Sequence, residues 1–387
     1  MSVETYSIHY PPEIAFGPGI AASLPEKLAN RKRILLAAGT HFIHTREYAQ
    51  LLDSLKDFAV HTESGIHAEP PLADVDRLTR AGREFRADAV VAVGGGSVID
   101  CAKAAAALIP LDGTCAEYFT GSRSIPGKGL FFAALPTTAG TGAEITNNAV
   151  LTDPETKIKK SLRHPRMVAD LALVDPLLTM SCPPALTAAS GLDAFVQAFE
   201  SCTSPKASAV TRALSCGALV KFAANLEKAC QNGSDPSART EMAEGSMMSA
   251  MAFSQTGLGA IHGLAHPIGS LLGVPHGKAC AALIPAVVEW NLPLCERQYG
   301  EIARRCGFGK NADDFLALCL KLCRETGVKA GFREYGLNDS HFDFIVKNCR
   351  SASMKLNPRP MSDEDVRNLL KGLVRSEEHT SELQSRI

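Results

Sequence analysis

The chain has 387 residues, of which 45% are hydrophobic and 21% are charged, and its 40 basic and 41 acidic residues give a net charge of −1. This balance is typical of a globular protein of about two domains and leaves no basic surface for nucleic acid. Because the first residues lack the layout of a signal peptide and no apolar run is long enough to span a bilayer, we expect a cytoplasmic protein without nucleic-acid or membrane partners.

Short apolar runs alternate with helical patterns in the first half of the chain. RILLAAG, ADAVVAVGGG, GLFFAALP and LALVDP are the apolar runs, and LLDSLKDF, VDRLTRAGREF and SVIDCAKAAAAL have helical spacing. Continuous apolar strands that alternate with helices are typical of a parallel sheet with helices on both faces. The pattern predicts a doubly wound α/β domain over residues 1–177.

Strand signals nearly vanish after Pro176. The stretches PPALTAASGLDAFVQAFESC, SAVTRALSCGALVKFAANLEKAC and ARTEMAEGSMMSAMAFSQTG are all helical in pattern. We therefore expect a second, helical domain over residues 178–374, with the active site in a cleft between the two domains. Residues 375–387 are polar and resemble a translated sequencing adapter, so we interpret them as a foreign or disordered tail without function.

The twelve cysteines are scattered along the chain, and none of them form C-x-x-C pairs. Several lie in helical stretches, as Cys319 and Cys323 do. Without a secretion signal, this usage indicates reduced, buried thiols in a cytosolic protein.

The segment VVAVGGGSVIDCAK places three glycines and a serine between a predicted strand and a helix. Glycine lets the backbone approach a ligand and take positive φ, and a helix N-terminus suits a pyrophosphate. Because the pattern is not G-x-G-x-x-G, a purely steric turn is the alternative. The residues of this candidate phosphate loop and of the helix after it are Gly94, Gly95, Gly96, Ser97, Asp100 and Lys103.

A second loop, PTTAGTGAEIT, follows the next predicted strand. It offers the hydroxyl groups of Thr137, Thr138 and Thr141 among glycines. Such a loop suits a ribose, a phosphate or the amide of a nicotinamide. The alternative interpretation is a tight turn with capping threonines.

Three of the eleven histidines lie within the segment HGLAHPIGSLLGVPHG. His262 and His266 are four residues apart, so both project from one helical face, and His276 lies in a Pro-His-Gly turn. Asp193 and Gln197 form a second pair with helical spacing. An aspartate with imidazoles suits a divalent cation with an open coordination position, whereas structural packing is the alternative.

The motifs together resemble the group III, or iron-containing, alcohol dehydrogenases. The resemblance covers about residues 5 to 374 and rests on AFGPG, GGGSVIDCAK, PTTAGTGAEIT, ALVDP, GLDAF, HGLAHPIG with PHG, and LNPRPMSDEDV. It implies a Rossmann-like α/β domain and an all-helical domain, the architecture of dehydroquinate synthase. It also implies a nicotinamide cofactor, a divalent metal, iron(II) or zinc, and a homo-oligomer, a dimer or larger.

The resemblance also assigns roles to single residues. It implies that the phosphate loop of Gly94 to Ser97 holds the pyrophosphate and that His266 is a proton relay beside the nicotinamide. The residues implied for the ribose and nicotinamide are Thr137, Thr138, Thr141 and Lys159. Those implied for the metal are Asp193, His262 and His276, and those bordering the substrate pocket are Asn148 and Phe253.

Two positions depart from the family pattern. Gln197 stands where the family usually has a fourth ligand histidine, and an amide oxygen is a harder and weaker ligand than imidazole for iron or zinc. Gly39 stands where many NAD-preferring relatives have an aspartate that would repel a 2′-phosphate. We therefore expect a working site with lower metal affinity or a shifted metal choice, and NADP, or dual use with NAD.

The resulting prediction is a metal-dependent dehydrogenase that transfers hydride reversibly between nicotinamide C4 and a small alcohol or aldehyde. Because of Gln197, the alternatives are a metal-independent reductase and an inactive cofactor-binding relative. A lyase like dehydroquinate synthase would need a more basic pocket than the helical half offers, where Lys278 is one of few basic residues near the histidines.

Overall fold

A computed structural model describes residues 5–28 and 30–374, which form two compact units. One unit contains residues 9–182 and 233–247, and the other contains residues 5–8, 183–232 and 248–374. The predicted domain limits, 1–177 and 178–374, stay a prediction. The segment 375–387, which we interpret as a tail, lies outside the described residues.

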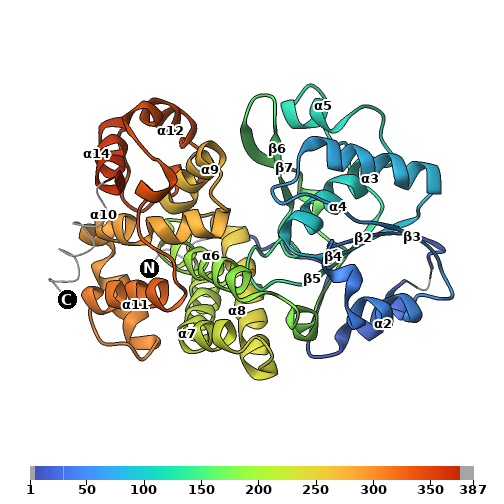
Figure 1. Cartoon of the computed structure of the whole chain (residues 1–387), viewed down its shortest axis with the longest axis horizontal. Coiled ribbons are helices and arrows are strands. Elements are labelled where there is room, and N and C mark those ends of the chain that lie inside the picture. Colours follow the sequence, from blue (N-terminus) through green and yellow to red (C-terminus); the bar gives the residue numbers. More distant parts are fainter. Residues whose placement is uncertain (1–4, 29, 375–387) are drawn as a thin grey trace. The chain divides into compact units, whose positions relative to one another are not determined.

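A six-stranded parallel sheet forms the centre of the first unit (Figure 1). Its order is β1-β8-β5-β4-β2-β3. The strands are β1 (Glu13–Phe16), β2 (Arg33–Ala38), β3 (Ala59–Glu63), β4 (Ala89–Gly94), β5 (Phe131–Pro136) and β8 (Leu171–Val174). The four predicted apolar runs form β2, β4, β5 and β8, which confirms them as strands. They are apolar throughout because these strands are buried on both faces of the sheet.

Alternate side chains of these strands enter two separate cores, one on each face of the sheet. Leu35 and Val90 pack on one face against α3 (Leu72–Phe85), α4 (Gly96–Leu108) and α5 (Cys115–Thr120). Ile34 and Val91 pack on the other face against α1 (Leu24–Lys27) and α2 (Arg46–Ser54). The predicted doubly wound sheet with helices on both faces is confirmed, and Figure 1 shows α3 and α2 on opposite sides of the strands.

The sequence interpretation missed β1, β3 and an antiparallel hairpin. The hairpin joins β6 (Asn148–Asp153) to β7 (Ile158–Arg163), and most side chains of β7 are exposed. A polar strand such as IKKSLR has no apolar run to reveal it, which is why it was missed. The predicted helix LLDSLKDF is displaced toward the N-terminus, because α2 begins at Arg46 and ends at Ser54.

The second unit consists of helices among its described residues. They include α6 (Pro184–Thr203), α7 (Ala209–Gln231), α9 (Ala260–Leu272), α10 (His276–Arg305), α11 (Ala312–Glu325), α12 (Phe342–Asn348), α13 (Ala352–Lys355) and α14 (Asp363–Val374). A further helix, α8 (Pro236–Thr256), belongs to both units: its residues up to Met247 are part of the first unit, and those from Met248 are part of the second. The predicted all-helical second half is therefore confirmed for the described residues.

The helix α6 is buried almost all round, including its polar residues Asp193, Gln197 and Glu200. A helix that is apolar on every side belongs to a core, so each polar group on it needs a partner or a function. Among the described helices, α10 is long and apolar enough to cross a membrane by length and composition, but 61% of its apolar window is buried inside the protein.

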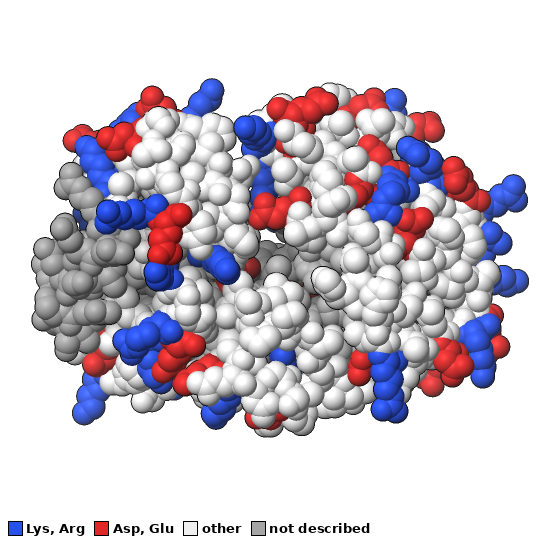
Figure 2. Space-filling view, viewed as in Figure 1, with Lys and Arg blue, Asp and Glu red and all other residues white. Residues whose placement is uncertain are grey.

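Charged side chains of both signs are interspersed over the face of the molecule in Figure 2. No broad region of that face carries basic side chains alone. This distribution agrees with the net charge of −1.

Candidate active site

The strand order reverses between β2 and β4. The chain runs from β2 to β3 on one side and from β4 through β5 to β8 on the other. In open α/β sheets, ligands bind outside the carboxyl ends of the strands at such a switch point. Gly39 follows β2 here, and its backbone N–H donates to the carbonyl of Val93 at 2.9 Å. Gly39 therefore lies beside the phosphate loop.

Close packing, and not a positive φ, explains why glycine is required at two positions of the phosphate loop. A Cβ on Gly94 would lie 2.6 Å from the Cβ of Val98, and one on Gly96 would lie 2.5 Å from Oγ1 of Thr141. None of the three glycines has positive φ, so that part of the sequence interpretation is wrong. The α4 N-terminus thus packs directly against the threonine loop, with its first N–H groups at the strand end.

Glu69 connects two predicted cofactor residues. Its backbone N–H donates to Oγ of Ser97 at 3.2 Å, and its carboxylate accepts from Nζ of Lys159 at 2.9 Å. Thr137 is joined to the loop by its backbone N–H, which donates to the carbonyl of Gly94. The structure therefore brings Ser97, Lys159 and the threonine loop to one end of the sheet.

Asp100 ties α4 to the hairpin of β6 and β7. Its carboxylate accepts from the backbone N–H of Val150 at 2.9 Å and lies 3.5 Å from Nζ of Lys103. Burial raises the pKa of Asp100 and lowers that of Lys103, while their mutual attraction opposes both shifts. These contacts are those of a buried structural pair.

Three helices of the second unit bring four donor side chains together. One potential ligand atom from each of Asp193 on α6, His262 on α9, and His276 and Cys280 on α10 lies within 4.8 Å of all the others. Oδ1 of Asp193 is 3.1 Å from Nε2 of His262 and 3.8 Å from Nε2 of His276. The Sγ atom of Cys280 is 3.7 Å from Nε2 of His276. A compact, buried set of this kind is typical of a metal site.

Glu200 orients His262. The carboxylate of Glu200 accepts from the backbone N–H groups of Gly259 and Ile261 at 2.9 and 2.8 Å, which are otherwise unsatisfied at the N-terminus of α9. It lies 2.6 Å from Nδ1 of His262. Because an ionised carboxylate only accepts, Nδ1 carries the proton, and Nε2 is the atom presented to Asp193 and to a cation.

Three small or rigid residues place His276. α9 ends at Leu272, and Gly273 follows it with φ +67°. Pro275 precedes α10, and His276 is the first residue of that helix, so the turn that we expected around His276 is wrong. A Cβ on Gly277 would lie 2.2 Å from the carbonyl oxygen of Ala189. Glycine therefore lets the start of α10 contact the backbone of α6, one turn before Asp193.

His266 lies against His276. Their rings stack with centroids 4.8 Å apart and an interplanar angle of 10°. The ring of His262 is tilted relative to His276, with centroids 5.5 Å apart. The predicted i, i+4 pair on α9 therefore places both histidines beside His276, and His266 is the more exposed of the two.

The donor cluster concentrates negative charge in a buried place. Burial lowers the pKa of His262, but the charges of Cys280 and Glu200 outweigh it and leave that pKa well above its ordinary value. Burial raises the pKa of the Cys280 thiol to about 12 although His262 opposes the shift. The raised pKa of His262 indicates a site that attracts positive charge, whereas the shift at Cys280 is mainly the effect of burial.

Gln197 provides a test of whether a cation fits. It lies one turn after Asp193, is buried, and its Oε1 atom has no hydrogen-bond partner among the residues that the structure describes. A buried acceptor without a donor is costly, and a cation would satisfy it. The orphaned oxygen and the Asp–His–His–Cys donors both fit a divalent metal.

Sequence comparisons cover both halves of the chain. Residues 11–176 match the iron-containing alcohol dehydrogenase profile, and residues 187–374 match that of the C-terminal domain of the Fe-containing alcohol dehydrogenase family. The chain belongs to the iron-containing alcohol dehydrogenase family. It is 32% identical over 375 residues to long-chain-alcohol dehydrogenase 1 of Geobacillus thermodenitrificans, covering 93% of this chain and 94% of that protein.

Two further proteins that the chain resembles agree with this assignment. 1,3-Propanediol dehydrogenase of Klebsiella pneumoniae is 30% identical, with 95% of this chain and 98% of that protein covered. The crystal structure of sulfoacetaldehyde reductase from Bifidobacterium kashiwanohense in complex with NAD+ has a TM-score of 0.88 and 28% identity, with coverage of 96% and 99%. The predicted family and its fold are confirmed.

The assignments of single residues stay predictions, but the structure places them as follows. Asp193, His262 and His276 come together, with His266 beside them. Asn148 begins β6, where its side-chain amide donates to Oγ of Ser161. Phe253 is half-buried on α8.

The sequence interpretation missed two further residues in or beside the donor cluster of this chain, Glu200 and Cys280. Helical spacing places each of them on the face of a predicted ligand, because Glu200 follows Asp193 by seven residues and Cys280 follows His276 by four, but it does not show which helix that face meets.

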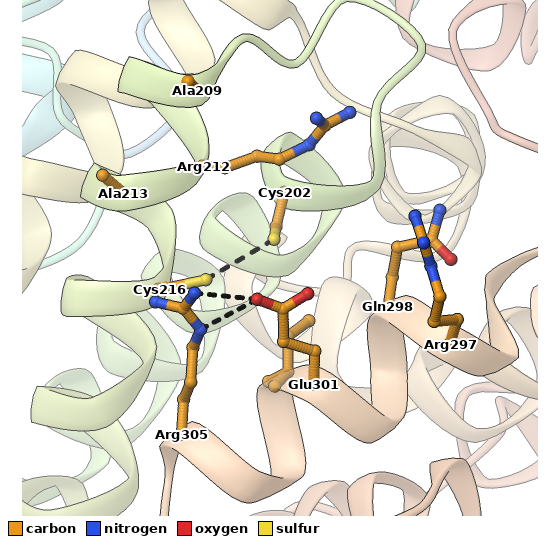
Figure 3. A pocket seen from close by; sticks show the side chains of 10 residues that line it. Cys202, Ala209, Arg212, Ala213, Cys216, Arg297, Gln298, Glu301 and Arg305 are labelled. Carbon is orange, nitrogen blue, oxygen red and sulfur yellow. Dashed lines mark hydrogen bonds and ion pairs between the residues drawn. The ribbon is translucent and has the colours of Figure 1, made fainter.

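A separate pocket of about 360 Å³ lies between α6, α7 and α10 (Figure 3). Arg212, Arg297 and Arg305 contribute positive charge to its lining. The Sγ atoms of Cys202 and Cys216 lie there 3.8 Å apart. Its lining includes none of the four clustered donors, so this pocket is not the metal site.

Proposed function

We propose that the chain is a metal-dependent, NAD(P)-linked alcohol dehydrogenase that interconverts a small alcohol with its aldehyde or ketone. The observation that carries the proposal is the buried convergence of Asp193, His262 and His276 in a chain of this family. Relatives named as alcohol and propanediol dehydrogenases support an alcohol as substrate.

The residues would hold the metal as follows. Asp193 supplies negative charge, and His262 and His276 supply imidazole Nε2 atoms, with Glu200 fixing the tautomer of His262. A divalent cation bound there supplies Lewis acidity, which lowers the pKa of an alcohol hydroxyl and polarises a carbonyl. His266, stacked on His276, would exchange the hydroxyl proton with solvent.

The nucleotide would bind at the strand ends of the α/β unit. The N–H groups at the α4 N-terminus would bind an anion such as the pyrophosphate, and the threonine loop and Lys159 would contact the rest of the nucleotide at the same edge. The nicotinamide supplies or accepts the hydride. The twelve free cysteines, all among the described residues, support a reducing, cytoplasmic location, and the expected homo-oligomer stays a prediction.

Metal removal tests the proposal. After chelator treatment, alcohol-dependent reduction of NADP and of NAD should fall to background, and one of iron(II), zinc, nickel or manganese should restore it. The measurement is the rate of absorbance change at the reduced-nicotinamide band, together with metal content per chain. Full activity in metal-free protein would remove the metal from the reaction. Nucleotide binding without turnover under every condition would favour an inactive cofactor-binding protein.

The absence of an acid at Gly39 predicts use of NADP. In Gly39→Asp, the new carboxylate should repel the 2′-phosphate and lower kcat/KM for NADP by about ten-fold or more, the equivalent of ~1.4 kcal/mol. A Cβ at this position meets no atom closer than 3.6 Å, so the variant should fold.

Gly39→Asn, which has the same shape without the charge, is the matched control and should keep most of the NADP activity. An equal loss in both variants would make the effect steric, and a preference of the unaltered protein for NAD would contradict the prediction.

A further inference from the structure

Cys280 is the one member of the donor cluster for which we predicted no role. It lies on α10 one turn after His276, so both side chains leave the same face of the helix. The residue is fully buried, and its Sγ atom faces imidazole nitrogen. Other buried cysteines differ, because Sγ of Cys323 and Sγ of Cys349 donate to the backbone carbonyls of Ala281 and Val346.

The separations match a tetrahedral site. With metal–nitrogen and metal–oxygen bonds of about 2.0–2.1 Å and metal–sulfur bonds of about 2.3 Å, tetrahedral ligand atoms lie roughly 3.3–3.6 Å apart. The separations between ligand atoms are 3.1 Å for Asp193 and His262, 3.8 Å for Asp193 and His276, and 3.7 Å for His276 and Cys280. The other three pairs lie within 4.8 Å, so the four atoms need shifts of about 1 Å to surround one ion.

The charges also balance. One carboxylate, from Asp193, and one thiolate, from Cys280, neutralise a divalent cation. The charge of Glu200 is compensated separately, because its oxygens accept from two N–H groups at the positive end of α9. Cysteine binds a metal as the thiolate, so metal binding at Cys280 should release a proton.

The geometry points to Cys280 as the fourth protein ligand of the metal, completing an Asp193–His262–His276–Cys280 set that prefers a sulfur-binding divalent cation, zinc or cobalt(II). Thiolate is a soft ligand, whereas the amide oxygen of Gln197 is a hard one, so the two candidates predict different metals. The inference rests on the proposed function, because it requires a metal at this cluster.

Cobalt(II) spectroscopy on the whole protein tests the proposal directly. The stripped protein is loaded with one cobalt(II) per chain, and its absorption is recorded from the near ultraviolet to the red. A thiolate ligand gives a sulfur-to-cobalt charge-transfer band in the near ultraviolet, which oxygen and nitrogen ligands lack. We expect this band, and we expect Cys280→Ser to lose it while it keeps the visible bands of bound cobalt.

Matched variants assign the band to one sulfur. Cys295→Ser changes another buried cysteine of α10 and should keep the band, as should Gln197→Ala. In zinc competition, Cys280→Ser should bind zinc about 100-fold more weakly than the unaltered protein. Changing a residue that only orients a metal ligand weakens metal binding by about 10–100-fold, so the loss of a ligand should reach the upper end of that range. Should Cys280→Ser fail to fold, Cys280→Ala and the spectrum of the unaltered protein carry the test.

The outcomes separate this proposal from the proposed function. A cobalt protein that oxidises alcohols without the near-ultraviolet band overturns Cys280 as a ligand and leaves the dehydrogenase intact. A protein that shows the band without turnover supports Cys280 and contradicts the dehydrogenase. A chain that retains no metal and has no activity overturns both.

Discussion

His262→Ala should abolish metal retention and alcohol oxidation together. The Nε2 atom of His262 is 3.1 Å from Oδ1 of Asp193, and its ring is buried, so water cannot easily replace it. Losing the several kcal/mol of charge stabilisation that a bound metal supplies corresponds to a fall in kcat/KM of about a thousand-fold or more. The measurement combines steady-state kinetics with metal content per chain.

The control for this variant is His44→Ala, which removes an exposed histidine of the α/β unit. It should leave metal content and kcat/KM close to those of the unaltered protein. Circular dichroism should show that His262→Ala retains its helices. Full activity and full metal content in His262→Ala would exclude it from the ligand set and, with it, the proposed mechanism.

The part of the site that lies within one helix could be predicted from the sequence. His262 and His266 share a helical face because their spacing fixes it, and Asp193 was recognised as the carboxylate in GLDAF. The same holds for the sheet, since buried parallel strands are continuous apolar runs with short connections. Local spacing was enough in each of these cases.

The residues that were missed depend on how helices cross. Glu200 has a role only because the N-terminus of α9 lies beside α6 and leaves N–H groups for its carboxylate. Cys280 matters only because the close approach at Gly277 brings α10 onto α6. No periodicity within one segment reports either crossing, so the sequence presents both residues as ordinary members of buried helices.

The reason for a glycine in the phosphate loop also could not be predicted from local sequence. The sequence predicts a loop that must accommodate a ligand, but the structure gives a different reason for Gly96, whose missing side chain makes room for Thr141. A neighbour that is 45 residues away in the chain determines the choice of residue, and it cannot be seen until the two loops are placed side by side.

Glu200→Gln should weaken metal binding by about 10–100-fold although the side chain keeps its size. One oxygen of Glu200 accepts from the N–H of Ile261, and the other accepts from Gly259 and lies 2.6 Å from Nδ1 of His262. An amide must turn its NH2 group toward one of these donors, whichever way it is flipped. If it faces His262, the proton moves to Nε2 and blocks the ligand atom.

Either orientation leaves one buried backbone N–H, that of Gly259 or that of Ile261, without its acceptor, at a cost of about 1–3 kcal/mol in the free energy of unfolding. Metal affinity by chelator competition therefore distinguishes the two orientations, and urea unfolding measures the cost that they share. Glu301→Gln, on an exposed carboxylate of α10 that pairs with Arg305, is the matched control and should change neither. Unchanged metal affinity and unchanged stability in Glu200→Gln would mean that the carboxylate does not orient His262, and the histidine would then have to be held by its packing alone.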